Sequence, residues 1–114
     1  MALVSARGPV RRGEVYLVAL DPTRGREIRK TRPCMVVSPD ELNSALGTFI
    51  VAPLTTGTHP YPFRIPCRFA GKNGHLILDQ VRTVDRERLV RRLGKLSTGA
   101  LQSTLRVLQE IFAP

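Results

Sequence analysis

The sequence has very few of the residues that hold metal ions or form disulfides. Its only cysteines are Cys34 and Cys67, and its only histidines are His59 and His75. Two distant cysteines do not support a disulfide framework or a paired-cysteine metal site, so we expect two reduced thiols buried among apolar neighbours. The histidines do not form a cluster with the spacing of metal ligands. The sequence therefore predicts no metal and no cofactor.

Long apolar runs are also absent. The chain has no stretch of about 18 apolar residues, so no membrane-spanning helix is predicted. Near the N-terminus the arginines precede a strand-like stretch with alternating polar residues, which is not the layout of a signal peptide. We therefore expect a cytoplasmic protein.

Negative charge is scarce. Nine Asp and Glu face eighteen Lys and Arg in 114 residues, which leaves a net charge of +9. Lysine occurs only at positions 30, 72 and 95, so the excess is mostly arginine, whose planar guanidinium suits phosphate. Such an excess favours nucleic acid, an acidic protein segment or a membrane surface as partner. No basic amphipathic helix is predicted, which disfavours the membrane.

The length and the 42% hydrophobic content fit a single domain with its own core. We expect a flexible basic arm at residues 1–11 and one domain at 12–114. Pro53 suggests that its strand is an edge or carries a bulge, and the Gly-Lys-Asn-Gly sequence at 71–74 predicts a hairpin turn. Strands are predicted at 14–20, 34–38, 48–55, 63–70 and 75–84, the last with a bend near Asp79.

Two helices complete the expected fold. Ser38 as N-cap, Pro39 as first residue and Glu41 in a capping box predict a short helix that ends before Gly47. Ser97 is the expected N-cap of a C-terminal helix, whose apolar face is Leu101, Leu105, Leu108 and Phe112. The charged segment 85–96 has no assigned element. The predicted fold is mainly β (α+β), a small, strongly bent or partly closed antiparallel sheet with these two helices.

The loop at residues 21–33 concentrates charge of one sign. Glu27 is its only anion after Asp21, whereas its cations number five: Arg24, Arg26, Arg29, Lys30 and Arg32. A structural loop seldom collects one sign in this way, so the loop is a candidate site for a polyanion. Pro33 restricts Arg32 to extended backbone and so helps to aim its side chain.

Three segments in order resemble the MazF/PemK-type toxin endoribonucleases: GEVYLVALDPTRGREIRKTRPCMVVSP, VAPLT and LDQVRTVD. The resemblance runs from about Arg12 to the end of the chain. It implies an SH3-like barrel, a homodimer, and the toxin half of a bacterial type II toxin–antitoxin pair. It further implies sequence-specific, metal-independent cleavage of single-stranded RNA that leaves 2′,3′-cyclic phosphate and 5′-hydroxyl ends. A MazE-like antitoxin with an acidic disordered tail would inhibit it.

The resemblance also assigns residues. Its catalytic positions fall on Arg32, Thr55 and Glu27, and later contacts to RNA fall on Gln80 and Arg82. The loop reads GREI where a common family form reads Gly-Ser-Glu-Gln, so the RNA contacts and the cut sequence should differ. The residues expected to bind RNA are Arg24, Arg26, Arg29, Lys30, Gln80, Arg82 and Tyr61.

The chemistry of RNA cleavage leaves alternatives open for these residues. The 2′-hydroxyl must lose a proton, the phosphorane must be stabilised, and the 5′-oxygen must gain a proton. Arg32 suits the second task as a bidentate clamp, although it could equally be a surface arginine that begins a strand. Thr55 could orient the phosphate or simply end a strand. Glu27 could act as the base, but we favour a role in which its negative charge balances the charge of the loop cations.

Other residues also allow two interpretations. Gln80 and Arg82, two apart, would share one face of a strand, which suits RNA but equally a solvated face. Tyr61 could stack on a base. Surface or packing roles are favoured over catalysis for His59 and His75. At the level of function, the alternatives are a non-catalytic CcdB-like toxin and a basic RNA-binding protein of the same fold.

Overall fold

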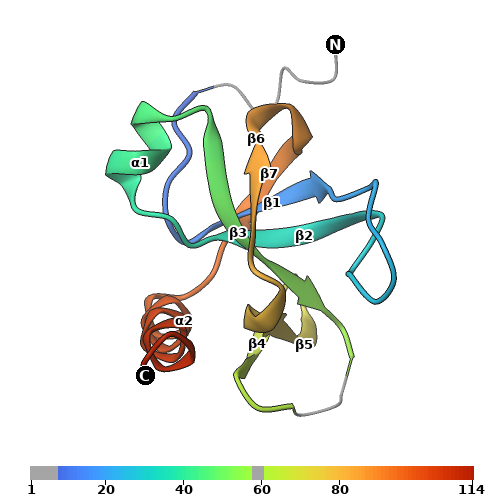
Figure 1. Ribbon diagram of the computed structural model, residues 1–114, viewed down its shortest axis with the longest axis vertical. Coiled ribbons are helices and arrows are strands. Elements are labelled where there is room, and N and C mark those ends of the chain that lie inside the picture. Colours follow the sequence, from blue (N-terminus) through green and yellow to red (C-terminus); the bar gives the residue numbers. More distant parts are fainter. Residues whose placement is uncertain (1–7, 58–60) are drawn as a thin grey trace.

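The computed structural model describes residues 8–57 and 61–114, so His59 lies outside the described residues. The fold is a strongly bent, seven-stranded antiparallel sheet with a short helix and a C-terminal helix, as predicted (Figure 1). The strands are β1 (Glu14–Ala19), β2 (Thr31–Val36), β3 (Thr48–Thr55), β4 (Arg64–Phe69), β5 (Lys72–Ile77), β6 (Arg82–Asp85) and β7 (Leu89–Lys95). The helical elements are α1 (Asp40–Ala45), η2 (Leu78–Gln80), η3 (Arg86–Arg88) and α2 (Thr98–Ile111).

Most predicted elements are confirmed, and 75–84 is indeed bent, since η2 separates β5 from β6. The segment 85–96 proves to be η3 and β7. The strands are ordered β4-β5-β3-β2-β1-β7, and β6 pairs with β3 away from this path. None of the helices in the described ranges is long and apolar enough to cross a membrane.

Strand β2 shows how the core is arranged. Its alternate residues face two different apolar clusters, with Cys34 and Val36 in one and Met35 in the other. Both faces of the strand are therefore buried, which explains why the sequence here is a continuous apolar run. Val10, within the predicted N-terminal arm, is also buried in the first cluster.

The prediction that Pro53 marks an edge strand is wrong. Strand β3 is interior: it pairs with β2 on one side, and on the other with β6 through Thr48–Val51 and with β5 through Leu54 and Thr55. Pro53 lies between these two partners, where no neighbouring strand needs its missing N–H. The proline thus marks the point where β3 changes partner.

The predicted hairpin turn at 71–74 is also displaced. Phe69 pairs with Lys72, so the turn is Ala70–Gly71, and both residues have left-handed backbone with φ of 53° and 78°. Gly74 lies inside β5, where a Cβ would sit 1.9 Å from the carbonyl oxygen of Thr55. Gly74 is therefore required for close approach to β3 rather than for the turn.

The start of α1 differs from the predicted capping box. Pro39 is the N-cap and makes no side-chain cap bond. Ser38 is buried; its hydroxyl contacts the Asn43 side chain and accepts a hydrogen bond of 3.0 Å from the Ile50 N–H. The serine therefore ties α1 to β3 instead of capping the helix with Glu41.

Helix α2 begins as predicted. The Ser97 hydroxyl accepts a hydrogen bond of 3.1 Å from the Ala100 N–H, and Leu101 and Leu108 pack on the second apolar cluster. Phe112 does not join that face: it ends the helix and is 75% exposed. In Figure 1, α2 lies near the β4–β5 hairpin, whereas α1 lies at the opposite end of β3.

Candidate functional site

The cationic loop between β1 and β2 is closed by its own backbone. The Leu20 N–H donates a hydrogen bond of 2.9 Å to the Lys30 carbonyl oxygen, and Lys30 takes a left-handed φ of 71°. Within the loop, Glu27 donates its N–H to the Arg24 carbonyl, and its carboxylate accepts from the Arg24 N–H. One oxygen of Glu27 therefore holds a turn that presents the neighbouring cations.

A second set of bonds fixes the loop from outside. We call Gln80, Arg82 and Arg88 the loop bracket, because each binds the backbone near one end of the loop. The Gln80 side-chain oxygen accepts from the Ile28 N–H at 2.7 Å, and Arg82 Nη1 donates to the Leu20 carbonyl at 3.0 Å. Arg88 Nη1 donates to the carbonyls of Ala19 and Asp21 at 2.9 and 2.6 Å. The bracket thus connects the loop to η2, β6 and η3.

A groove of about 420 Å³ runs between the loop and the bracket. Its loop side is formed by Arg26, Glu27 and Ile28, and Gln80 and Arg82 face them. The structure therefore brings together four of the residues predicted for the site, in what we call the loop groove. The expectation that Gln80 and Arg82 share one strand is wrong, since Gln80 belongs to η2 and Arg82 begins β6.

Arg32 and Thr55 lie at neighbouring ends of β2 and β3. Cys34 and Pro53 are the last pair between β2 and β3, and Arg32 and Thr55 each lie two residues beyond that pair. Arg32 is half-buried, and its Nε donates a hydrogen bond of 3.3 Å to the Arg29 carbonyl. A cation and a hydroxyl are thereby positioned at the end of one strand pair.

Cys34 lies beneath these cations. Burial raises the pKa of its thiol to about 12, although the charges of Arg82 and Arg32 act in the opposite direction. The thiol therefore stays protonated at neutral pH and is a packing group, as predicted. Cys67 is also a free thiol, but it is only half-buried.

Tyr61 is connected to the loop groove through charge. The Arg64 guanidinium lies over the Tyr61 ring at 4.7 Å and binds both oxygens of Asp79 at 3.0 Å. The Arg64 hydrogen bond lowers the pKa of Asp79, which lines the loop groove. The structure thus places Tyr61 on an exposed surface beside the groove.

The other predicted residues lie around this centre. Arg24, Arg29 and Lys30 are exposed on the loop, and Arg29 also donates a hydrogen bond of 3.0 Å to the Gly25 carbonyl. His75 Nδ1 lies 3.0 Å from the Gly57 carbonyl, on β5. Within residues 8–57 and 61–114, no three His, Cys, Asp or Glu side chains are grouped so that they could hold a metal ion.

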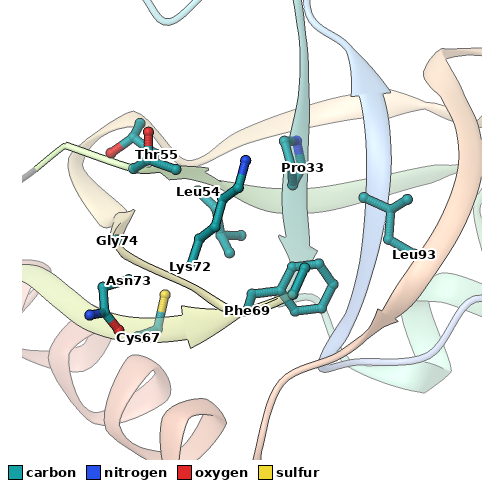
Figure 2. Close-up of a pocket in the computed structure, with 11 residues that line it drawn as sticks. Pro33, Leu54, Thr55, Cys67, Phe69, Lys72, Asn73, Gly74 and Leu93 are labelled. Carbon is teal, nitrogen blue, oxygen red and sulfur yellow. The ribbon is translucent and has the colours of Figure 1, made fainter.

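A second groove, of about 500 Å³, is lined by residues of β2, β3, β4, β5 and β7. We call it the Thr55 groove because Thr55 stands at one end of it (Figure 2). Lys72 and Asn73 contribute polar groups to its wall. The apolar side chains that form most of the wall are Pro33, Leu54, Cys67, Phe69, Ala70 and Leu93.

The sequence pattern of one known family covers nearly the whole chain. The family described as "PemK-like, MazF-like toxin of type II toxin-antitoxin system" matches residues 11–112. The chain belongs to this toxin family. All residues of the loop groove and the Thr55 groove fall within the matched range.

Individual relatives of this PemK-like, MazF-like chain support the same family assignment. It is 35% identical to Endoribonuclease MazF9 of Mycobacterium tuberculosis over 103 residues, which span 81% of this chain and 86% of the relative. It is 35% identical to Endoribonuclease PemK of Escherichia coli over 88 residues, which span 73% and 66% of the two chains. The predicted family is thereby confirmed.

Solved structures show the same fold. MazF from Deinococcus radiodurans superimposes with a TM-score of 0.82 at 24% identity, covering 92% of this chain and 97% of the other. An endoribonuclease in complex with its cognate antitoxin, from Mycobacterial species, gives a TM-score of 0.77 at 20% identity over 92% and 97%.

Sequence reasoning missed Arg88 in this PemK-like, MazF-like fold. It was one of several arginines in a charged segment, and its partners are main-chain carbonyls 67 and 69 positions away. A side chain that binds distant backbone leaves no pattern in the sequence, so only the structure identifies it.

Proposed function

We propose that this chain is an endoribonuclease toxin that cleaves single-stranded RNA at a short preferred sequence. The observation that carries the proposal is the loop groove, which gathers Arg26, Glu27, Gln80 and Arg82 in a chain of the toxin family. The names of the relatives, which are 35% identical, support the same activity. The net charge of +9 suits an RNA substrate.

In the proposed reaction, the 2′-oxygen attacks the adjacent phosphorus and the bond from phosphorus to the 5′-oxygen breaks. The 2′-hydroxyl loses a proton, the 5′-oxygen gains one, and the products are a 2′,3′-cyclic phosphate and a 5′-hydroxyl. Arg32 holds two phosphoryl oxygens as negative charge builds on them. Thr55, across the strand pair from Arg32, orients the phosphate through its hydroxyl.

The sequence favoured Glu27 as a counter-charge for the loop cations, but its position in the loop groove makes it the proposed proton acceptor. The loop groove has two carboxylates, Glu27 and Asp79. Both oxygens of Asp79 already accept hydrogen bonds from the Arg64 guanidinium. Glu27 uses Oε1 to hold the Arg24 turn, so we assign the proton to its Oε2. The RNA backbone would lie along the exposed cations Arg24, Arg29 and Lys30, with Tyr61 available to stack on a base.

We further propose that the toxin is a homodimer in the cytoplasm and that a cognate antitoxin inhibits it. One structure of the same fold is an endoribonuclease bound to its cognate antitoxin. A MazE-like tail rich in carboxylates would meet the same loop cations as RNA does, because both ligands are extended polyanions.

The test is incubation of the purified protein with single-stranded RNA in EDTA, followed by analysis of the RNA ends. Cleavage with cyclic phosphate and 5′-hydroxyl ends is expected. Cleavage that requires added Mg²⁺ or Mn²⁺ would contradict the metal-independent reaction. RNA binding without cleavage would favour the basic RNA-binding alternative, and no action on RNA would favour a CcdB-like toxin that acts by protein contact.

A further inference from the structure

We propose that the Thr55 groove is a subsite for one unstacked nucleobase of the RNA, with Lys72 at its mouth binding an adjacent phosphate. This inference rests on the proposed function and adds a place for the substrate outside the loop groove. The groove measures about 500 Å³, within the range of roughly 300–1,000 Å³ that is typical of small-ligand sites. It is lined by five separate segments of the chain.

The wall of the groove suits the face of a base. Phe69, Leu93 and Pro33 offer apolar and aromatic surface, and Leu54 also lines the groove (Figure 2). Bases stack on such surfaces without regard to sequence, because every base has an apolar π-face. Thr55, Thr56 and Asn73 supply the few polar groups that could fix the edge of a base.

The charge at the mouth indicates an anion next to the apolar group. Lys72 is exposed, and its side chain extends between Thr55 and Pro33 in Figure 2. Within residues 8–57 and 61–114, Lys72 makes no ion pair. A nucleotide combines a flat apolar base with a phosphate one sugar away, which matches Phe69 and Lys72 on the same groove.

Gly74 fixes part of this shape. A Cβ on Gly74 would lie 1.9 Å from the Thr55 carbonyl oxygen, so its absence lets β5 approach the end of β3. A Cβ on Gly94 would lie 3.4 Å from Phe69 Cε1, an ordinary van der Waals contact, so the ring lies directly beside Gly94 on β7. The groove is therefore set by backbone packing and exists before a ligand enters.

The reaction itself calls for such a subsite near Thr55. The 2′-oxygen, phosphorus and 5′-oxygen must come into line, and continuous stacking of the flanking bases opposes that arrangement. If Phe69 held one base out of the stack, stacking would no longer restrict the RNA backbone at the phosphate that Thr55 orients. The three reacting atoms could then come into line. An apolar residue of an antitoxin tail is the competing occupant, but the reaction geometry gives a reason only for the base.

The first experiment is a double-mutant cycle between protein and RNA. Single abasic nucleotides are placed in turn along a short single-stranded RNA whose attacking 2′-hydroxyl is replaced by hydrogen, and affinities are measured for wild type and Phe69→Leu. At one position the abasic change should weaken wild-type binding roughly tenfold and Phe69→Leu binding much less. Phe112→Leu, an exposed aromatic on α2, is the matched control and should behave like wild type.

Lys72→Gln tests the proposed contact between Lys72 and a phosphate. Lys95→Gln removes the same charge elsewhere and is the control. Lys72→Gln should reduce the dependence of RNA binding on salt by about one phosphate contact, and Lys95→Gln should not. Melting temperatures of all variants are compared first, so that a folding defect is recognised. Purely additive effects of Phe69→Leu and every abasic position would overturn the proposal.

Cys67 provides an independent measurement, because its sulfur points into the groove in Figure 2 whereas Cys34 is fully buried. RNA should slow alkylation of Cys67, and the abasic RNA identified above should protect it less. Loss of antitoxin binding in Phe69→Leu with unchanged RNA binding would assign the groove to protein and overturn the proposal. If wild type cleaves RNA but shows no coupling, the subsite fails alone; if it does not cleave, the proposed function fails.

Discussion

The main-chain N–H of Ile28 donates a 2.7 Å hydrogen bond to the side-chain oxygen of Gln80, 52 positions later in the chain. This bond joins the cationic loop to η2 across the loop groove. Ile28 also packs against the first apolar cluster, so the loop is held by both a polar and an apolar contact at one residue.

Gln80→Leu should loosen the loop without unfolding the protein. The change removes the acceptor of the Ile28 N–H, at a cost of about 1 kcal/mol, so amide exchange at Ile28 should become roughly fivefold to tenfold faster. RNA cleavage should fall at the same time. Gln80→Glu keeps an acceptor and should keep slow exchange, and Gln102→Leu on α2 is the matched control. Unchanged exchange at Ile28 in Gln80→Leu would contradict the role of the bracket.

Arg32→Ala should lower the single-turnover cleavage rate by roughly 10²-fold or more, the scale for losing a donor that stabilises developing charge. RNA affinity should fall far less, because the other loop cations remain. Arg106→Ala, exposed on α2, removes the same charge elsewhere and should cut RNA normally. A wild-type rate for Arg32→Ala would show that the loop has been misassigned.

Thr55→Val should slow cleavage by about tenfold and leave the fold intact. The change removes one hydroxyl and with it the proposed hydrogen bond to the charged phosphate. It keeps the β-branched shape that strands favour. The measurement is the cleavage rate beside the melting temperature. If the rate is unchanged, Thr55 serves only to end β3.

His59→Ala and His75→Ala should each retain most of the cleavage rate. His75 lies 3.0 Å from the Gly57 carbonyl, a contact that fits a packing role, whereas His59 lies outside the described residues. The rates are compared with that of Arg32→Ala at one pH. A histidine variant that falls as far as Arg32→Ala would point to acid–base catalysis by histidine.

Salt should separate the two polyanionic ligands proposed for the loop. RNA affinity should drop steeply with added salt because each neutralised phosphate releases counterions, whereas we expect apolar contacts to contribute part of the antitoxin's binding. In a competition titration at two salt concentrations, raised salt should therefore favour the antitoxin. The Arg24→Ala/Arg29→Ala double variant should weaken both ligands. Simultaneous binding of RNA and antitoxin would show that they do not share the loop.

The correct sequence-based predictions depend on local signals. Helix α2 follows from the Ser97 cap and a repeating apolar face, and the bounds of β3 follow from its composition. The displaced hairpin turn shows the limit of such signals. Asn73 and Gly74 have the local chemistry of a turn, but Gly74 is needed where β5 meets Thr55, and that contact is not local.

The candidate site shows the same contrast between what local sequence indicates and what only non-local contacts determine. The family resemblance assigned Glu27, Gln80 and Arg82 to one site, and the structure places them around one groove. The resemblance does not reveal that Gln80 and Arg82 bind the loop backbone, since main-chain groups have no sequence signature. Their proposed contacts with RNA therefore have to share these side chains with a structural role.

Strand β3 changes partner at Pro53, so it links β6 to the β4–β5 hairpin. Its first half belongs with β6 and its last two residues with β5, and proline leaves no orphaned donor where the partners change. Among β3 residues, only Leu54 and Thr55 connect this strand to β5 by pairing. Thr55 is therefore one of the two β3 residues that pair with the β4–β5 hairpin. In the proposed function, a base bound against the hairpin and the Thr55 hydroxyl would be linked through this short stretch of pairing.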